Sequence, residues 1–171
     1  AIGVPYSAAI AAAGGFPPYR FSSETGYVEE ASAAAFQGLG VRQNWNEDEG
    51  AWSYPLPFPF PFFGTLHETM VVSSNGYMQL GPGNPLEFDN TAEGLIRSSR
   101  IAPLWADLRT TGGGDIYITE TPDSVTVRWN GTSYHTGGGV NFEAELSSDG
   151  SIRFAYGSGN TALSPTIGIS A

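Results

Sequence analysis

Residues 54–81 read YPLPFPFPFFGTLHETMVVSSNGYMQLG, and this stretch decides the fold class. It begins with four prolines at alternate positions, Pro55, Pro57, Pro59 and Pro61, which are separated by leucine and phenylalanine. Proline fixes φ and donates no backbone hydrogen bond, so the segment can form neither a helix nor a central strand. It therefore predicts an extended edge segment whose apolar side chains pack inward, as in a secreted β-sandwich.

Short stretches with alternating apolar character recur from residue 68 to residue 169. Turn sequences separate them, such as Asn75-Gly76, Pro122-Asp123 and Ser148-Asp149-Gly150. The predicted strands are Glu68–Ser73, Tyr77–Leu80, Ile101–Leu104, Asp115–Thr119, Ser124–Trp129, Asn141–Leu146, Ile152–Tyr156 and Thr166–Ile169. We therefore expect an all-β fold, an antiparallel β-sandwich of about 8–10 strands, immunoglobulin-like or jelly-roll-like.

The chain has 171 residues, enough for one domain with a sizeable core, or for one domain plus an arm. Its net charge is −10, all seven basic residues are arginine, and cysteine is absent. So few cations disfavour both nucleic-acid binding and a membrane-surface role. No stretch is long and apolar enough to span a bilayer. We expect neither a nucleic-acid partner nor membrane insertion.

The first 22 residues differ in composition from the rest of the chain. They predict one strand near Val4–Ala12 and a shorter one near Tyr19–Ser22. The alternative is an alanine-rich helix over Ser7–Ala13, which is too short to be stable alone. We therefore divide the chain into an N-terminal β arm (1–22) and a β-sandwich domain (23–171). The arm residues expected to mediate assembly are Val4, Tyr6, Ala8, Ile10, Tyr19 and Phe21.

The segment between the arm and the proline-rich stretch has the least regular pattern. Glu29–Phe36 is compatible with one short helical turn. Farther on, Glu47, Asp48 and Glu49 form an acidic cluster, and carboxylates are ligands that Ca²⁺ prefers. The spacing is not that of an EF-hand loop, so a solvated acidic loop is the alternative. Calcium is the one cofactor that the sequence indicates.

Aromatic residues in predicted loops are candidates for ligand binding. Trp45 and Trp52 flank the acidic cluster, and Tyr134 lies in a later loop. Such rings could bind glycan or protein, although most of the 22 aromatic residues (4 Trp, 8 Tyr and 10 Phe) must lie in the core. Asp107, next to Trp105, is expected to cap a turn rather than to bind a metal ion.

No arrangement of residues required for catalysis is apparent. His67 and His135 are far apart in sequence and belong to no H-x-H or H-E-x-x-H motif. A nucleophilic serine would need a G-x-S-x-G elbow, which the chain lacks. We therefore expect no enzymatic activity and name no catalytic residue.

Six short motifs, taken together, resemble the nidogen-type extracellular β domain of bacterial surface proteins. They cover residues 54–169, and the last motif ends one residue later: LPFPFPFFG (56–64), VVSSNGYMQLG (71–81), IAPLWADL (101–108), VTVRWNG (125–131), FEAELSSDGSIRFAYG (142–157) and TIGIS (166–170). The resemblance implies an extracellular β-rich module of adhesive or matrix proteins, without catalytic residues. Separately, GVPYSAAIAAAGGFPPYRFS (3–22) resembles the opening strands of immunoglobulin-like repeats.

These features predict a structural protein of the cell surface or extracellular space. We expect a self-assembling filament or matrix subunit whose arm pairs with the next copy by β-strand addition. The partner would then be the chain itself. The alternative is an adhesive module of a larger secreted protein, which binds an extracellular glycan or protein through Trp45, Trp52 and Tyr134.

Overall fold

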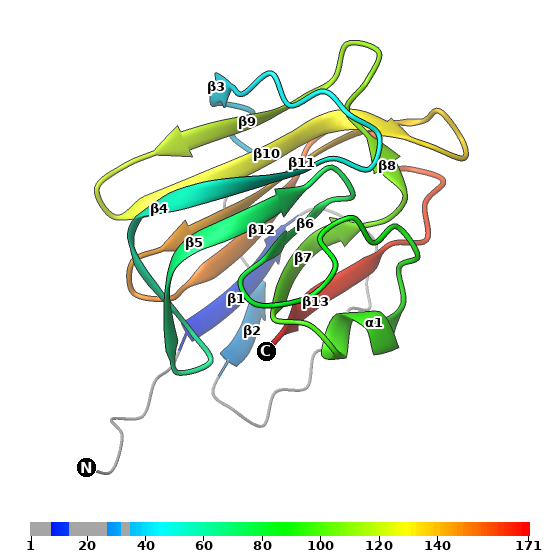
Figure 1. The fold of residues 1–171 in the computed structure, drawn as a ribbon. Helices are drawn as coiled ribbons and strands as arrows, with labels where there is room; N and C mark the ends of the chain where they lie inside the picture. Colours follow the sequence, from blue (N-terminus) through cyan, green and yellow to red (C-terminus); the bar gives the residue numbers. More distant parts are fainter. Residues whose placement is uncertain (1–7, 14–26, 32–34) are drawn as a thin grey trace, which may run out of the picture.

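The computed structural model describes residues 8–13, 27–31 and 35–171. Within these residues the chain forms 13 strands and one short helix, α1 (Ala92–Ile96). The strands make two sheets that pack face to face (Figure 1). The predicted all-β sandwich is confirmed. Its strands outnumber the expected 8–10 partly because two of them are only two residues long.

The smaller sheet consists of β4 (Ala51–Phe62), β5 (Thr65–Ser73), β6 (Tyr77–Gln79), β7 (Arg100–Trp105) and β13 (Thr166–Ser170). Their order across the sheet is β13-β7-β6-β5-β4, and all neighbours are antiparallel. The helix α1 lies beside this sheet in the connection from β6 to β7 (Figure 1). Thr91 caps it by accepting a hydrogen bond of 2.9 Å from the Gly94 amide.

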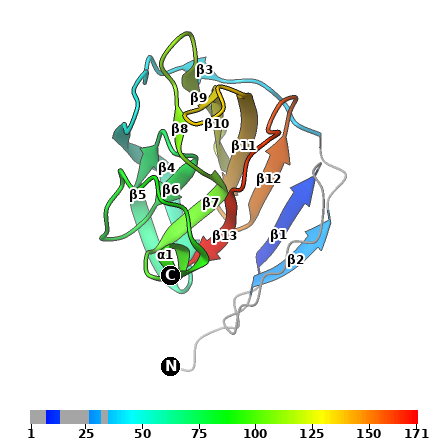
Figure 2. The ribbon, with the colours of Figure 1, turned by 90° about the vertical axis from the view of Figure 1, so that its right-hand side faces the viewer.

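The larger sheet consists of β1 (Ala8–Ala13), β2 (Tyr27–Ala31), β3 (Val41–Arg42), β8 (Leu108–Arg109), β9 (Asp115–Glu120), β10 (Ser124–Ser133), β11 (Gly139–Ser147) and β12 (Ile152–Tyr156). Their order is β2-β1-β12-β11-β10-β9-β3, and β8 also pairs with β10. All pairs are antiparallel except those of β1, which runs parallel to both β12 and β2. Figure 2 shows β1 and β2 extending this sheet beyond β12.

The proline-rich strand β4 lies at an edge of the smaller sheet, as the sequence predicts. Pro55, Pro57 and Pro59 are exposed, whereas Phe60 and Phe62 are buried in the core. The pairing with β5 shifts its register between Pro55 and Phe60. A proline has no N–H to offer a further strand, so this edge resists pairing with another chain.

The main core fills the space between the two sheets and joins them directly. Trp129 of β10 and Phe142 of β11 stack with ring centroids 5.2 Å apart. A second cluster, with Trp105 and with Leu95 of α1, is separate from this core. Beside it the buried Arg100 guanidinium lies 4.4 Å from the Trp105 ring and 3.0 Å from a Glu87 carboxylate oxygen.

The three predicted hairpin turns are present, and β12 has the predicted bounds. The helical turn expected in Glu29–Phe36 is wrong where the structure describes it, because Tyr27–Ala31 forms β2. Backbone pairing with β1 overrides the weak local helix preference there. In the arm, Ala8–Ala13 is a strand rather than a helix, while Val4, Tyr6 and the segment Tyr19–Ser22 lie outside the described residues. None of the helices in the described ranges has the length and apolar character needed to cross a membrane.

Candidate functional site

The acidic loop between β3 and β4 is held by buried polar side chains. Asp115 is fully buried and accepts hydrogen bonds from the Trp45 amide (2.9 Å) and the Ile116 amide (2.8 Å). It also pairs with Arg42, and although burial opposes the charge, these bonds lower the pKa of Asp115 below its ordinary value. Thr110 donates to the Trp45 carbonyl at 2.7 Å. The loop therefore has a defined backbone position.

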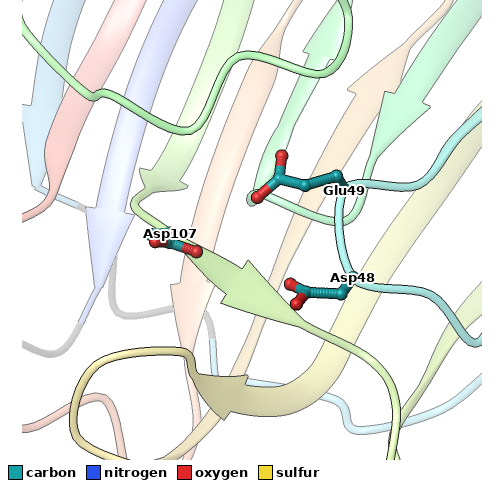
Figure 3. Close-up of side chains that lie close together, drawn as sticks. All are labelled: Asp48, Glu49 and Asp107. Carbon is teal, nitrogen blue, oxygen red and sulfur yellow. The ribbon is translucent and has the colours of Figure 1, made fainter.

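Three carboxylates converge where this loop meets the end of β7. Asp48, Glu49 and Asp107 each place a carboxylate oxygen within 4.8 Å of the others (Figure 3). We call these three residues the carboxylate cluster. Glu47, the third residue of the predicted calcium-binding group, is outside it, and Asp107 supplies the third carboxylate instead.

The contacts of the cluster keep its carboxylates close together. Asn75 is buried; it donates to Glu49 at 2.8 Å, and its carbonyl oxygen accepts from the Leu108 amide at 2.9 Å. His135 Nε2 lies 3.2 Å from Asp107 Oδ2. The other oxygen of Asp107 is buried, and no hydrogen-bond donor among the described residues reaches it.

Burial and mutual repulsion oppose the charge on these groups. Burial raises the pKa of Glu49, and the neighbouring charges of Asp107 and Asp48 raise it further. Burial also raises the pKa of Asp107; the proximity of His135 opposes this, whereas Asp48 and Asp89 add to it. Carboxylate oxygens at this spacing are suited to a hard divalent cation such as Ca²⁺, which would relieve the repulsion.

A cavity of about 540 Å³ lies beside Asp107. Its polar lining includes Asp89, Asn90 and His135 as well as Ser133. The volume is in the usual range for small-molecule sites, although the lining is more polar than is typical. His67 is elsewhere, on β5, where its ring centroid lies 6.3 Å from that of Phe62, so the two histidines do not form a joint site.

Trp45 and Trp52 lie together, but their rings face each other. The two rings are stacked at 5.1 Å with an interplanar angle of 3°, and the Tyr54 ring meets Trp45 edge-on at 6.3 Å. A Cβ at Gly50 would lie 2.3 Å from Trp52, so the backbone also packs closely on that ring. Both tryptophans are half-buried, and this geometry indicates a mainly structural role.

Tyr134, the third aromatic candidate, lies in the connection from β10 to β11. Its side chain is 50% exposed. The Arg109 guanidinium is 5.6 Å from its ring centroid, and the His135 ring meets it at 5.6 Å. Tyr134 therefore belongs to the surroundings of the carboxylate cluster, through His135 and Asp107, and offers a ring to solvent there.

The arm forms a second site, in the larger sheet. Ala8–Ala12 of β1 pair in parallel with Tyr27–Ala31 of β2, and Ile10–Ala13 pair with Ile152–Ala155 of β12. Of the predicted assembly residues, Ala8 and Ile10 lie in this strand, whereas Val4, Tyr6, Tyr19 and Phe21 lie outside the described residues.

The fold defines an all-β sandwich module, and comparison with known families assigns it to a family. The NIDO-related, or nidogen-related, family model matches residues 18–171, so the chain belongs to this family. Membership confirms the resemblance in residues 54–169 and suggests an extracellular context. The immunoglobulin-like resemblance of residues 3–22 is not confirmed. No curated protein and no solved structure matches the chain.

Some site residues could not be identified by sequence reasoning. Asp107 is 58 residues from Glu49, and its sequence context predicted a turn cap. Glu143, a buried glutamate in an otherwise regular strand, accepts backbone hydrogen bonds from Gln37 and Gly38 at 2.8 and 3.2 Å. A charged residue within the alternating pattern of β11 signals a carboxylate with a specific role, but the sequence does not show which backbone amides donate to it.

Proposed function

We propose that the chain is a non-enzymatic structural subunit of the extracellular space or cell surface, which assembles with copies of itself through its N-terminal arm. The observation that carries this proposal is the position of β1. This strand bonds through its backbone to a strand on each side, and both partners belong to the following part of the sequence. The same hydrogen bonds can be formed with another copy, which is how β-strand addition works.

The edge that β1 covers needs a strand beside it. Ile152 and Phe154 of β12 are buried in the core between the two sheets. Without β1, the backbone N–H and C=O groups of this side of β12 would be unpaired. A strand from the same chain or from a neighbour satisfies them equally.

Three of the four outermost strands of the two sheets are poor alternatives for assembly. Prolines occupy β4, and β3 is only two residues long. The outer strand β2 carries two exposed glutamates, Glu29 and Glu30. Charge, proline and short length all discourage edge pairing, so they favour assembly through β1.

The proposal is tested by deletion of residues 1–22, with particle size measured by light scattering and electron microscopy. We expect uniform filaments from the full chain and none from the truncated chain. Circular dichroism controls for folding of the truncated sandwich. A second variant, Ala11→Pro, leaves the arm in place but removes one backbone donor from β1 and should have the same effect. Polymers from the truncated chain, or a monomeric full chain, contradict the proposal.

A second candidate function is a binding module for an extracellular glycan or protein. The half-exposed ring of Tyr134, which contacts His135 in the lining of the 540 Å³ cavity, favours it. A glycan-array signal that Tyr134→Ala abolishes would support this function, while Trp45→Ala and Trp52→Ala test the tryptophans. A signal that survives all three substitutions contradicts this set of binding residues.

A further inference from the structure

We infer that copies join when β1 of one copy inserts between β12 and β2 of another, parallel to both strands. We call the space between β12 and β2 the slot, and these two strands its walls. Only β1 is exchanged between copies. This inference rests on the proposed function and adds to it the receiving surface, the strand direction and the register. It also states that β2 stays with its own sandwich. Each wall is held by contacts that do not involve β1.

The β12 wall is held by the body of the sheet. Antiparallel pairing with β11 runs from Leu146 opposite Ile152 to Phe142 opposite Tyr156. The Arg153 side chain also pairs with Glu145 of β11, with Nε at 2.8 Å from the carboxylate. None of these contacts involves β1, so this wall persists without it.

The β2 wall is held by contacts at its start and after its end. Tyr27 is buried, with its ring centroid 6.0 Å from that of Phe62 and 4.9 Å from that of Phe63. These two phenylalanines belong to the smaller sheet and its first hairpin, so Tyr27 joins β2 to the opposite layer.

Beyond β2, the chain crosses the larger sheet as a strap of residues 36–38. Glu143 of β11 is 1% exposed and accepts hydrogen bonds from the Gln37 and Gly38 amides. A Cβ at Gly157 would lie 2.7 Å from the Phe36 ring, so this ring packs directly on the backbone after β12. The strap and Tyr27 together hold β2 against its own sandwich, and they leave β1 as the unit that can be exchanged.

The sequence between β1 and β2 is long enough for exchange. Parallel neighbours need a crossover of about a dozen residues, and the 13 residues 14–26 join these strands. Returning along a strand the length of β1 requires about 20 Å, whereas 13 extended residues span up to about 45 Å. The excess permits the strand to enter the slot of an adjacent copy.

Exchange of β1 replaces each hydrogen bond with an identical one, so its cost is low. The donated surface (β1) differs from the receiving surface (β12 and β2), so the contact is heterologous, and it gives an open filament when two copies do not exchange β1 reciprocally and the rotation between copies closes no ring. Repetition therefore gives a filament in which each copy donates one strand and receives one.

Cysteine cross-linking tests the joint, because the natural chain has no cysteine. Ala11 lies opposite Arg153 on one side and opposite Glu30 on the other. Neighbouring strands are about 4.8 Å apart, within the range for a disulfide. Single variants Ala11→Cys and Arg153→Cys are unfolded together, refolded as a mixture, oxidised and run on a non-reducing gel. Ala11→Cys is mixed in the same way with Glu30→Cys, whose exposed position tolerates substitution.

We expect disulfide-linked dimers in both mixtures, several-fold above a control mixture of Ala11→Cys with Asp123→Cys, which lies in the β9–β10 turn. The double variants Ala11→Cys/Arg153→Cys and Ala11→Cys/Glu30→Cys should each give a ladder of linked multimers.

If filaments form but Ala11→Cys/Glu30→Cys links only within a chain, β1 and β2 move together and the inference is wrong. If filaments form but no disulfide joins positions 11 and 153, the contact between copies lies elsewhere. This result overturns the inference, while the proposed function stands. Monomers linked only internally overturn both.

Discussion

The indole nitrogen of Trp129 donates a buried hydrogen bond of 2.7 Å to the backbone carbonyl of Ser73. Trp129 is on β10 of the larger sheet, and Ser73 ends β5 of the smaller one. The bond therefore links the two layers at the point where the β5–β6 hairpin turns. Asn75, two residues later, continues the connection by bonding to Leu108 and to Glu49 of the carboxylate cluster.

Replacement of Trp129 by phenylalanine should destabilise the fold. It removes one buried hydrogen bond from the Ser73 carbonyl, which still accepts from the Gly76 amide at 3.3 Å, so it costs about 0.5–1.5 kcal/mol of unfolding free energy. Urea unfolding followed by circular dichroism measures the loss. Trp45→Phe, in the half-buried aromatic stack, is the control and should cost less. Equal losses in the two variants would contradict a specific role for the Trp129 bond.

The carboxylate cluster should make stability fall as pH rises above the ordinary carboxyl range. Glu49 and Asp107 have pKa values raised above their ordinary values of 4.5 and 3.8, so the folded state holds protons that the unfolded state has released. Their stabilising contribution is complete below those ordinary values and is lost as pH rises through the raised values. Asp107→Asn should reduce this loss, as measured by urea midpoints between pH 4 and 7. The matched control Asp123→Asn changes an exposed turn residue. Identical pH profiles for the two variants would rule out the cluster as the cause.

Calcium should offset the same repulsion. At a free concentration ten times Kd, binding to the folded state adds about 1.4 kcal/mol, which corresponds to a Tm increase of about 3–5 °C at this chain length. Thermal unfolding in calcium and in chelator measures the difference, and Asp48→Asn should diminish it while Asp123→Asn should not. A Tm that is the same in calcium and in chelator would exclude a calcium site in the folded chain.

The exposed prolines of β4 should act as a barrier against edge pairing. The double change Pro57→Val and Pro59→Val restores two backbone donors on an exposed edge strand. We expect increased self-association in sedimentation velocity, measured on the chain lacking residues 1–22 so that arm-dependent assembly does not contribute. Pro122→Val, in an exposed turn, is the control for added apolar surface. Association that is no greater in the double variant than in the control would count against this role.

Sequence reasoning worked best where a local rule determined the structure. The prolines predicted the β4 edge because their φ and missing N–H act at the residue itself. Ile152–Tyr156 was predicted with its observed bounds because its alternation ends at a turn sequence on one side. Over the described part of Glu29–Phe36, the predicted helical turn was wrong because local preference is weak and pairing with β1 decides the conformation of Tyr27–Ala31.

The sequence by itself determined the all-β class, the protected proline edge and the turns, and its motifs indicated the nidogen-type family. It also excluded disulfides. The tertiary structure alone decided which distant groups meet: Asp107 with Asp48 and Glu49, Glu143 with the strap, and β1 between β12 and β2. The physical reason is range. Turns and strand alternation are set within a few residues, whereas these contacts depend on the order and register of strands in the sheets, which the packing of the whole core selects.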